Sequence, residues 1–430
     1  MRKAVVLGGY GLIGSACCAA LLARRYEVTA VGRTPAAARG DPRLRWEMRD
    51  IAVTTTAEWR QILSGADVVV NASGALQDGA RDSLAAIHDQ ALGRLVAALA
   101  GSKTRFIQIS AVGVAPYAAT EFLRSKARGE ARLIASPLDW VILRPALVIG
   151  PEAYGGTALL RAAAAVPGVF LRIYPEAPVQ TVWLGDVAEA VALAAGGHVA
   201  PGTIADLTEP ESQSFAGLVE RFRSWLGLAP WRLRLTMPPP LVTTLGRMAD
   251  GLGWLGWRAP LRSTALISLR DGIRGDPAPW AAAGGPPCRG LDETLALMPA
   301  TQQEIWFARL YLLLPLAIAV LSLFWALSGL LALLQPRAAS GVLTARGVAE
   351  GPALAIVFAG GLADLALGLG LLLRRWTVRA ALAMVVVASG YLAGSLWLAP
   401  DLWLDPLGPM LKVLPTLPLA LMVAALVPPR

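Results

Sequence analysis

The residues with the clearest chemical meaning are closely spaced glycines near the start of the chain. Gly8, Gly11 and Gly14 form a G-x-x-G-x-x-G string, which follows a short apolar run, Ala4–Leu7, and opens a helical pattern from Leu12 to about Arg24. Glycines allow a tight turn and close approach of a phosphate, and the start of a helix offers free amides and a positive dipole end. The string therefore predicts a dinucleotide pyrophosphate site. The expected contact residues are Gly8, Gly11, Leu12, Ile13 and Gly14.

The end of the next apolar run indicates which dinucleotide is preferred. The run Glu27–Val31 reads as a second strand and is followed by Gly32 and Arg33. An acid at this point accepts hydrogen bonds from a free ribose 2′-hydroxyl and repels a 2′-phosphate, whereas a guanidinium pairs with the phosphate. NADP(H) is therefore favoured over NAD(H). The alternative is that Arg33 is only a surface charge.

The elements that position these residues alternate between strand and helix. Further strands are predicted at residues 44–48, 67–71, 105–110, 140–144 and 204–207, and helices at 83–99, 122–135 and 214–226. Strand–helix alternation is typical of a parallel sheet with helical crossovers. The prediction is an α/β Rossmann-type, doubly wound parallel sheet over residues 1–230, including a small substrate-side lobe.

Six ordered motifs in this region resemble those of the extended and atypical short-chain dehydrogenases/reductases. After the glycine string come Asp50-Ile51, the N-x-A-G-like Asn71-Ala72-Ser73-Gly74, Ser110, the segment Arg144–Pro151 and Gly185-Asp186-Val187-Ala188. The resemblance implies adenine contacts from Asp50 and Ile51 and nicotinamide contacts from Pro145 and Val148. It also places Asn71, Ala72, Ser73 and Gly74 against the cofactor. The most similar subgroup contains the NAD(P)H-binding accessory subunit of respiratory complex I and its bacterial relatives.

The resemblance has a gap at the expected catalytic residues. The family uses a serine with a tyrosine and a lysine in Y-x-x-x-K, where the tyrosine exchanges a proton with the substrate oxygen. Ser110 and Lys126 match, but the tyrosine position is Phe122. Tyr117 is out of register with Lys126 and is a poor substitute. Ser110 and Lys126 are therefore the implied catalytic residues, and Lys126 is also expected to bind ribose.

The last part of the chain predicts a membrane domain. The chain is 55% hydrophobic and 16% charged, which departs from soluble averages in the direction of membrane proteins. Four apolar stretches are long enough, or nearly so, to cross about 30 Å of hydrocarbon. They lie at about 310–334, 353–373, 380–399 and 411–427. Residues 306–430 also resemble the DoxX-like domain, so an all-α transmembrane four-helix bundle is expected after the sheet domain.

Residues 231–305, between these two domains, read equally as an interfacial segment on the membrane or as an extension of the soluble lobe. Four spans place both chain ends on one side. Arginines 309, 374, 375, 379 and 430 then share that side, against Arg337 and Arg346 on the other. The positive-inside rule places the larger group, and with it the sheet domain and both termini, in the cytoplasm. The expected location is a multi-pass protein of the prokaryotic inner membrane, with the bilayer itself as partner.

Other residues narrow the function classes. Three cysteines without a C-x-x-C pair, and two histidines, predict no metal site. A net charge of +9 without a basic stripe predicts no nucleic-acid partner. His88 is expected at the surface. Asp364 lies inside an apolar stretch, where a carboxylate is costly, so it is either a packing contact or a functional residue, with Tyr391, Ser389 and Ser395 within its expected reach.

Three hypotheses for function follow from these observations. The first is a membrane-tethered oxidoreductase or isomerase that uses NADP(H) and acts on a lipophilic, quinone- or lipid-like substrate. The second is a dinucleotide-holding scaffold or assembly factor for a membrane complex, which Phe122 favours because a phenyl ring has no proton to give. The third, a nucleotide-gated transporter-like unit, rests on Asp364 alone.

Overall fold

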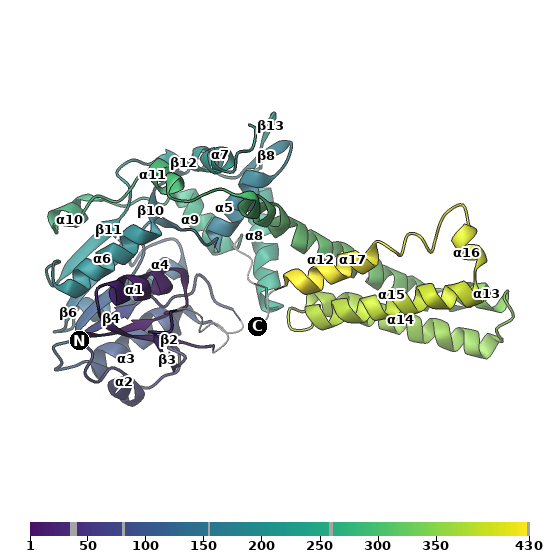
Figure 1. Ribbon diagram of the computed structural model, residues 1–430, viewed down its shortest axis with the longest axis horizontal. Helices are drawn as coiled ribbons and strands as arrows, with labels where there is room; N and C mark the ends of the chain where they lie inside the picture. The colour runs from purple at the N-terminus through teal and green to yellow at the C-terminus, as the bar shows by residue number, and fades with distance from the viewer. Residues whose placement is uncertain (35–40, 80–81, 154, 258–260, 428–430) are drawn as a thin grey trace. The chain divides into compact units, whose positions relative to one another are not determined.

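In the computed structural model the chain divides into two units, and residues 1–34, 41–79, 82–153, 155–257 and 261–427 are described. Unit 1 comprises residues 1–253 and 259–308, and unit 2 comprises residues 254–258 and 309–430. Figure 1 shows a sheet with helices in the first unit and long helices lying side by side in the second. Arg430, one of the arginines expected on the cytoplasmic side, lies outside the described residues.

Unit 1 is built on a seven-stranded sheet with the order β11-β6-β5-β4-β1-β2-β3, and all neighbouring strands are parallel. The strands are β1 Lys3–Leu7, β2 Glu27–Gly32, β3 Arg45–Met48, β4 Val68–Asn71, β5 Arg105–Ile109, β6 Asp139–Pro145 and β11 Thr203–Leu207. The predicted doubly wound parallel sheet is therefore confirmed. The strand order reverses between β1 and β4, and ligands of such sheets bind beyond the carboxyl ends of the strands at this point.

Helices cover both faces of this sheet, as the almost uninterrupted apolar runs of its strands require. The cluster that buries α1 (Leu12–Ala23) and α6 (Leu184–Gly196) contains Cys17 and Cys18, whose thiols serve packing. The other cluster buries α2 (Thr56–Ile62), α3 (Ala91–Ala98) and Leu133 of α4 (Glu121–Ile134). Figure 1 shows α1 and α6 together, with α2 and α3 on the opposite side of the sheet.

A smaller lobe completes unit 1 around its own apolar cluster, which includes Phe170, Phe222 and Trp231. Phe170 and Trp231 stack with their ring centroids 4.4 Å apart. The lobe contains short strand pairs, β7 with β10, β8 with β13 and β9 with β12. These strands are β7 Leu147–Ile149, β8 Val169–Arg172, β9 Pro178–Val179, β10 Thr181–Trp183, β12 Gln213–Ser214 and β13 Leu233–Thr236. The other helices of unit 1 are α5 Gly156–Ala165, α7 Phe215–Trp225, α8 Pro239–Trp254, α9 Ser263–Asp271 and α11 Leu291–Ala296. In contrast, α10 (Ala278–Ala282) packs against β11 and buries Trp280 in the cluster of α1 and α6.

Among the described residues, three helices are long and apolar enough to cross a membrane: α12 Gln302–Leu334, which enters unit 2 at Arg309, α14 Glu350–Leu372 and α15 Thr377–Leu398. The short helices α13 (Pro336–Thr344) and α16 (Asp401–Leu404) lie in the connections. Alanine, leucine and methionine side chains from the long helices form the buried core of this unit, together with residues of α17 (Thr416–Leu426). The predicted helical region with apolar helices is confirmed.

The fourth predicted stretch, 411–427, differs from the expectation. Only α17 within it is helical, and its 11 residues span about 16 Å at about 1.5 Å per residue, roughly half of a hydrocarbon core. Pro415 is the N-cap of α17 and Pro418 lies in its first turn. Proline fits the first turn of a helix but is costly in the interior, because it lacks an amide hydrogen and its ring clashes with the preceding turn, although α12 runs through Pro315. The high hydropathy of residues 411–427 does not show that the helix can begin only near Pro415.

Candidate dinucleotide site and polar centres

The glycine string forms a turn between β1 and α1. Gly8 has φ +75°, a left-handed conformation that favours glycine, and its amide donates a hydrogen bond to the Val31 carbonyl (3.0 Å). A Cβ on Gly14 would lie 2.1 Å from the Gly8 carbonyl oxygen, so α1 can begin here only with glycine. A Cβ on Gly11 would meet a single atom, that same oxygen at 3.2 Å, and would otherwise face open space. Gly8 and Gly14 are thus required by the backbone geometry of the turn, whereas Gly11 leaves space for a bound group at the start of α1.

The first turn of α1 fits a pyrophosphate. Gly11 is the N-cap of α1 and no side chain caps this end of the helix. Within the described part of the chain, the amides of Leu12, Ile13 and Gly14 have no acceptor, as expected for the first turn of a helix. Free amides at the positive end of a helix bind anionic groups. These residues therefore fit the dinucleotide that the sequence predicts.

Two other predicted segments lie next to this turn. Leu7 of β1 pairs with Asn71 of β4, and a Cβ on Gly8 would meet the backbone of Ala72 and Ser73 at 3.0 Å. The segment Asn71–Gly74 therefore forms the wall beside the glycine turn. After β3, Ile51 is buried and the Asp50 carboxylate accepts the Ala52 amide (2.9 Å). Their assignment to adenine remains a prediction.

Arg33, directly after β2, already has an anionic partner. Its guanidinium Nη1 lies 2.7 Å from Oδ1 of Asp82, and about a quarter of each side chain is exposed. A Cβ on Gly32 would lie 2.4 Å from the ring of Tyr10, so that ring lies against the end of β2. Sequence reasoning missed Asp82 because it stands 49 residues from Arg33 and follows no strand pattern.

Ser110 and Lys126 line one small cavity beyond β5, together with Asn71, Gln108 and Glu130. The Ser110 hydroxyl is buried and has no hydrogen-bond partner among the described residues. The Lys126 ammonium donates to the Ile109 carbonyl (3.3 Å), and burial lowers the pKa of Lys126 to about 8 although the nearby Glu130 carboxylate opposes this shift. The structure thus brings together a buried hydroxyl donor and an amine that titrates near neutral pH.

No phenol reaches this cavity in the described part of the chain. The Phe122 ring lies 5.5 Å from the Lys126 nitrogen, one helical turn away on α4, in the place of the expected tyrosine. Tyr117 is 90% exposed and precedes α4, so it lies in solvent. Pro145 ends β6 and is buried, while Val148 lies on β7 and is half-buried.

A buried polar network supports the floor of the cavity. The Asn71 amide donates to the Gln108 side-chain oxygen (2.9 Å) and accepts the Ser73 amide hydrogen (3.2 Å). Glu130 is buried and pairs through both of its oxygens with the guanidinium of Arg144 on β6. These groups are satisfied, whereas the Ser110 hydroxyl is a fully buried lining group without a hydrogen-bond partner within the described residues.

The expectation that His88 lies at the surface is wrong. His88 is 6% exposed and belongs to η2 (Ala85–Gln90), a π-helical turn. Its Nε2 accepts the Ala75 amide hydrogen (3.2 Å), so its Nδ1–H donates to Ser125 Oγ (2.8 Å), which donates to the Phe122 carbonyl (2.9 Å). Burial, with help from the charges of Lys126 and Arg128, lowers the pKa of His88 to about 2.

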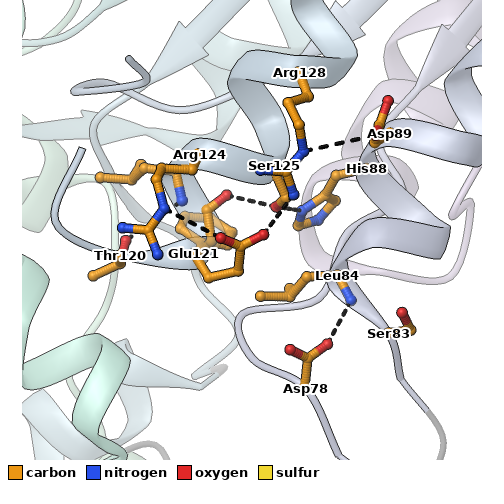
Figure 2. A network of polar contacts seen from close by, with 12 residues as sticks. Asp78, Ser83, Leu84, His88, Asp89, Thr120, Glu121, Arg124, Ser125 and Arg128 are labelled. Carbon is orange, nitrogen blue, oxygen red and sulfur yellow. Dashed lines mark hydrogen bonds and ion pairs between the residues drawn. The ribbon is translucent and has the colours of Figure 1, made fainter. Parts of the chain in front are cut away.

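Figure 2 shows His88 reaching Ser125 of α4 from the neighbouring turn, with charged residues around this contact. Arg128 pairs with both Glu121 and Asp89, so ion pairs close the same interface. The neutral histidine thus connects the segment after Asn71 with the helix that carries Phe122 and Lys126. The π-helical turn explains the wrong expectation, because one extra residue per turn rotates His88 away from the polar face.

In unit 2, Asp364 of α14 is buried and has two hydroxyl neighbours. Tyr391 of α15 donates to its Oδ1 (2.9 Å), and Ser328 of α12 lies at hydrogen-bond distance from its Oδ2 (3.4 Å). The predicted contact with Tyr391 is present. Ser395 instead bonds to the Leu392 carbonyl and accepts the Trp403 indole hydrogen, and Ser389 is exposed. No group of metal-binding side chains is found among the described residues.

Comparison with known proteins identifies two domains. Residues 8–167 match the NAD(P)H-binding family, and residues 322–421 match the DoxX-like family. An uncharacterized chloroplastic protein of Arabidopsis thaliana is 28% identical over 165 residues, or 36% of this chain. The match covers 53% of that relative, so the chain spans about half of its length.

Solved structures show the same fold as unit 1. The enzyme WbmH of Bordetella bronchiseptica, crystallized with NAD⁺, is 20% identical with a TM-score of 0.53, over 69% of this chain and 97% of WbmH. UDP-glucose 4-epimerase of Thermotoga maritima is 17% identical with a TM-score of 0.53, over 72% of this chain and 100% of the epimerase. The chain therefore carries an NAD(P)H-binding domain with the fold of these epimerases, followed by a DoxX-like domain with apolar helices.

Proposed function

We propose that this chain is a membrane-anchored oxidoreductase of the short-chain dehydrogenase/reductase type that uses a nicotinamide dinucleotide and acts on a lipophilic carbonyl compound. One observation carries the proposal: the unpartnered Ser110 hydroxyl and the Lys126 amine line the same cavity, beside the Asn71 segment that borders the glycine turn. A bound dinucleotide would supply the hydride. The residues of the chain must then hold the carbonyl oxygen and give it a proton.

Lys126 can take the place of the missing tyrosine. With a pKa of about 8, its ammonium is mostly protonated at pH 7 and is acidic enough to donate, since general acids work best when their pKa lies near the operating pH. The Ser110 hydroxyl can donate a hydrogen bond to the same substrate oxygen, because this hydroxyl has no hydrogen-bond partner among the described residues. Phe122 then contributes an apolar wall. This assignment predicts activity that falls as pH rises through about 8.

The preference for NADP(H) rests on Arg33. A guanidinium at the end of β2 suits a 2′-phosphate, and Arg33 is only partly buried. Asp82 competes for the same guanidinium at 2.7 Å. Binding of the phosphate would therefore require Arg33 to exchange one anionic partner for another, and the net preference should be modest.

The membrane anchor explains why the substrate should be lipophilic. Three apolar helices of unit 2 are long enough to cross a bilayer. The basic residues at 309, 374, 375 and 379 favour a cytoplasmic location of the dinucleotide domain. A reporter inserted in the 335–349 connection of the intact chain should report the external side. A cytoplasmic signal there would contradict this orientation.

The second candidate is a dinucleotide-binding scaffold without turnover, and Phe122 specifically favours it. The two candidates can be separated with purified protein in detergent, NADPH and two lipid-soluble carbonyl probes, decylubiquinone and farnesal. The oxidoreductase should oxidise NADPH with at least one probe, and Lys126→Met should abolish this activity while Tyr117→Phe, a change in an exposed phenol, leaves it intact.

The variant Phe122→Tyr sharpens the test. It places a phenol one turn before Lys126 on the same helical face. A gain of carbonyl reduction would show that Ser110 and Lys126 are arranged for hydride transfer. Absence of turnover with both probes in the wild type and in Phe122→Tyr, despite bound NADPH, would reject the oxidoreductase in favour of the scaffold.

A further inference from the structure

Asp364 lies deep inside an apolar helix without a compensating charge. It stands 8 residues from the last residue of α14 and 14 from the first, which correspond to about 12 and 21 Å of helix. Its side chain is 8% exposed. A carboxylate in such a place is costly unless a positive charge accompanies it, and acids inside apolar spans are therefore functional candidates.

The packed helices supply no such charge. Among the described residues, the other charged side chains on the helices of this unit are Glu304 and Arg309 on α12, Arg337 on α13, Glu350 on α14, Arg379 on α15 and Asp401 on α16. None of them makes an ion pair or a hydrogen bond with Asp364. The titratable tyrosines on these helices are Tyr311 and Tyr391, and only Tyr391 reaches the carboxyl. The negative charge is therefore unmatched.

The carboxyl is closed on one side and reachable on another. On the α12 side, a Cβ on Gly329 would lie 2.4 Å from the Gly361 carbonyl and 3.0 Å from the Cβ of Asp364, so the two helices touch. On the α15 side, Tyr391 is 44% exposed, and a Cβ on Gly360 would lie 3.0 Å from its hydroxyl. The approach to Asp364 therefore passes along the outward-facing ring of Tyr391.

The surroundings of this approach determine which cation fits. Mg²⁺ and Ca²⁺ take six or more oxygen ligands and Zn²⁺ prefers nitrogen and sulfur ligands, whereas the site offers one carboxyl and two hydroxyls. An onium ion needs no such shell, and a tyrosine ring adds attraction for it. The exposed residues on the same faces are apolar and suit a lipophilic body: Leu398 lies two turns from Tyr391 on α15, and Ile356 lies one turn from Gly360 on α14.

We propose that Asp364, Tyr391 and Ser328 form a site for a lipophilic organic cation, a quaternary ammonium or phosphonium, which displaces a proton from the carboxyl. The step is balanced: the neutral acid gives up one proton as the cation binds, and the carboxylate retains the cation as its counter-ion. Tyr391 donates to the carboxylate and presents its ring to the cation. This inference is independent of the proposed oxidoreductase activity.

Tetraphenylphosphonium is a suitable probe, and tetraphenylmethane is its neutral counterpart. Calorimetry on the full chain in detergent, repeated in buffers with different ionisation enthalpies, should show that protons are released when the cation binds. Asp364→Asn keeps the size of the side chain and its contacts with both hydroxyls, and should weaken binding by about tenfold or more, as expected for loss of a desolvated charge partner. Asp401→Asn, at an exposed acid paired with Arg346, is the matched control and should leave binding unchanged.

Two measurements distinguish loss of the cation site from misfolding of the variant. The proton count uses the wild-type chain alone, and NADPH binding by Asp364→Asn reports whether that variant is folded. Equal uptake of tetraphenylmethane, unchanged phosphonium binding in Asp364→Asn, or binding without proton release would each overturn the proposal. Loss of NADPH oxidation with intact cation binding would concern the proposed oxidoreductase only.

Discussion

Replacing Lys126 with methionine should stabilise the NAD(P)H-binding unit while it removes function. Burial lowers the pKa of Lys126 from the ordinary 10.5 to about 8. Each pKa unit corresponds to about 1.4 kcal/mol, so keeping this lysine charged in the folded protein costs about 3 kcal/mol at pH 7. Methionine has a similar length and carries no charge, so it avoids that cost.

The hydrogen bond lost in Lys126→Met offsets part of this stabilisation. Lys126 donates to the Ile109 carbonyl, but that carbonyl also accepts the Gln108 side-chain amide at 2.9 Å and remains satisfied. Glu130 keeps its pairing with Arg144. Subtracting about 1 kcal/mol for one hydrogen bond leaves an expected stabilisation of about 2 kcal/mol at pH 7.

The difference in stability between Lys126→Met and the wild type should depend on pH. Between pH 8 and 10.5 the unfolded chain binds more protons at this lysine than the folded chain, so the stability of the wild type rises with pH over this range. Lys126→Met has no such titration, so its stability advantage of about 2 kcal/mol should shrink from pH 8 upward, by about 1.4 kcal/mol per pH unit, and vanish by about pH 10.

Hydrogen exchange and thermal unfolding test this reasoning on the full chain in detergent. At pH 7 the most protected amides of β4 and β5 should exchange about 30-fold more slowly in Lys126→Met, as about 2 kcal/mol implies. The unfolding temperature should rise at pH 7 and converge with that of the wild type near pH 10. Lys103→Met, at an exposed lysine, is the control. A destabilised variant, or a gain independent of pH, would refute the burial argument.

Three further predictions follow from the glycine turn, the end of β2 and the buried histidine. Gly11→Asp should abolish NADPH binding in calorimetry without loss of stability, because aspartate is a good N-cap but repels phosphate, and retained binding would reject the site. Gly14→Ala should instead destabilise the unit, because its Cβ would lie 2.1 Å from the Gly8 carbonyl oxygen. Asp82→Asn should raise the ratio of NADPH to NADH affinity severalfold and Arg33→Ala should lower it, and equal effects on both cofactors would show that Arg33 is no selector. Because the folded-state pKa of His88 is about 2, below its ordinary 6.5, stability should fall as pH drops below about 6.5, by about 2 kcal/mol at pH 5; denaturation curves of His88→Gln should lack this slope, and an unchanged slope would contradict it.

The glycine turn between β1 and α1 could be predicted from sequence because its determinants are local. Gly8, Gly11 and Gly14 act within one turn, and the strand and the helix that flank them have strong periodic patterns. The helix bearing Phe122 and Lys126 was predictable for the same reason, since both residues lie on one face of a 14-residue helix.

Long-range pairs were not predictable. Asp82 contacts Arg33, and Ser328 contacts Asp364, across separations of 49 and 36 residues, and neither partner belongs to a recognisable motif. His88 was misplaced for another reason: its polar neighbours Asp89 and Gln90 suggested an exposed turn, but a π-helical turn changes which side faces inward. The length of α17 was overestimated because hydropathy averages do not register where prolines permit a helix to begin.

The π-helical turn at Ala85–Gln90 also has an evolutionary consequence. A π-helical turn closes its hydrogen bond one residue further along than an α-helical turn, so it is equivalent to an α-helix with one residue inserted. Here the widened turn places the His88 carbonyl where a Cβ on residue 129 would lie 2.1 Å away, so only glycine is accommodated on α4. The inserted residue and Gly129 should therefore be inherited as a pair. In aligned relatives, chains with any larger residue at position 129 should be one residue shorter between the equivalents of Ser83 and Ala91.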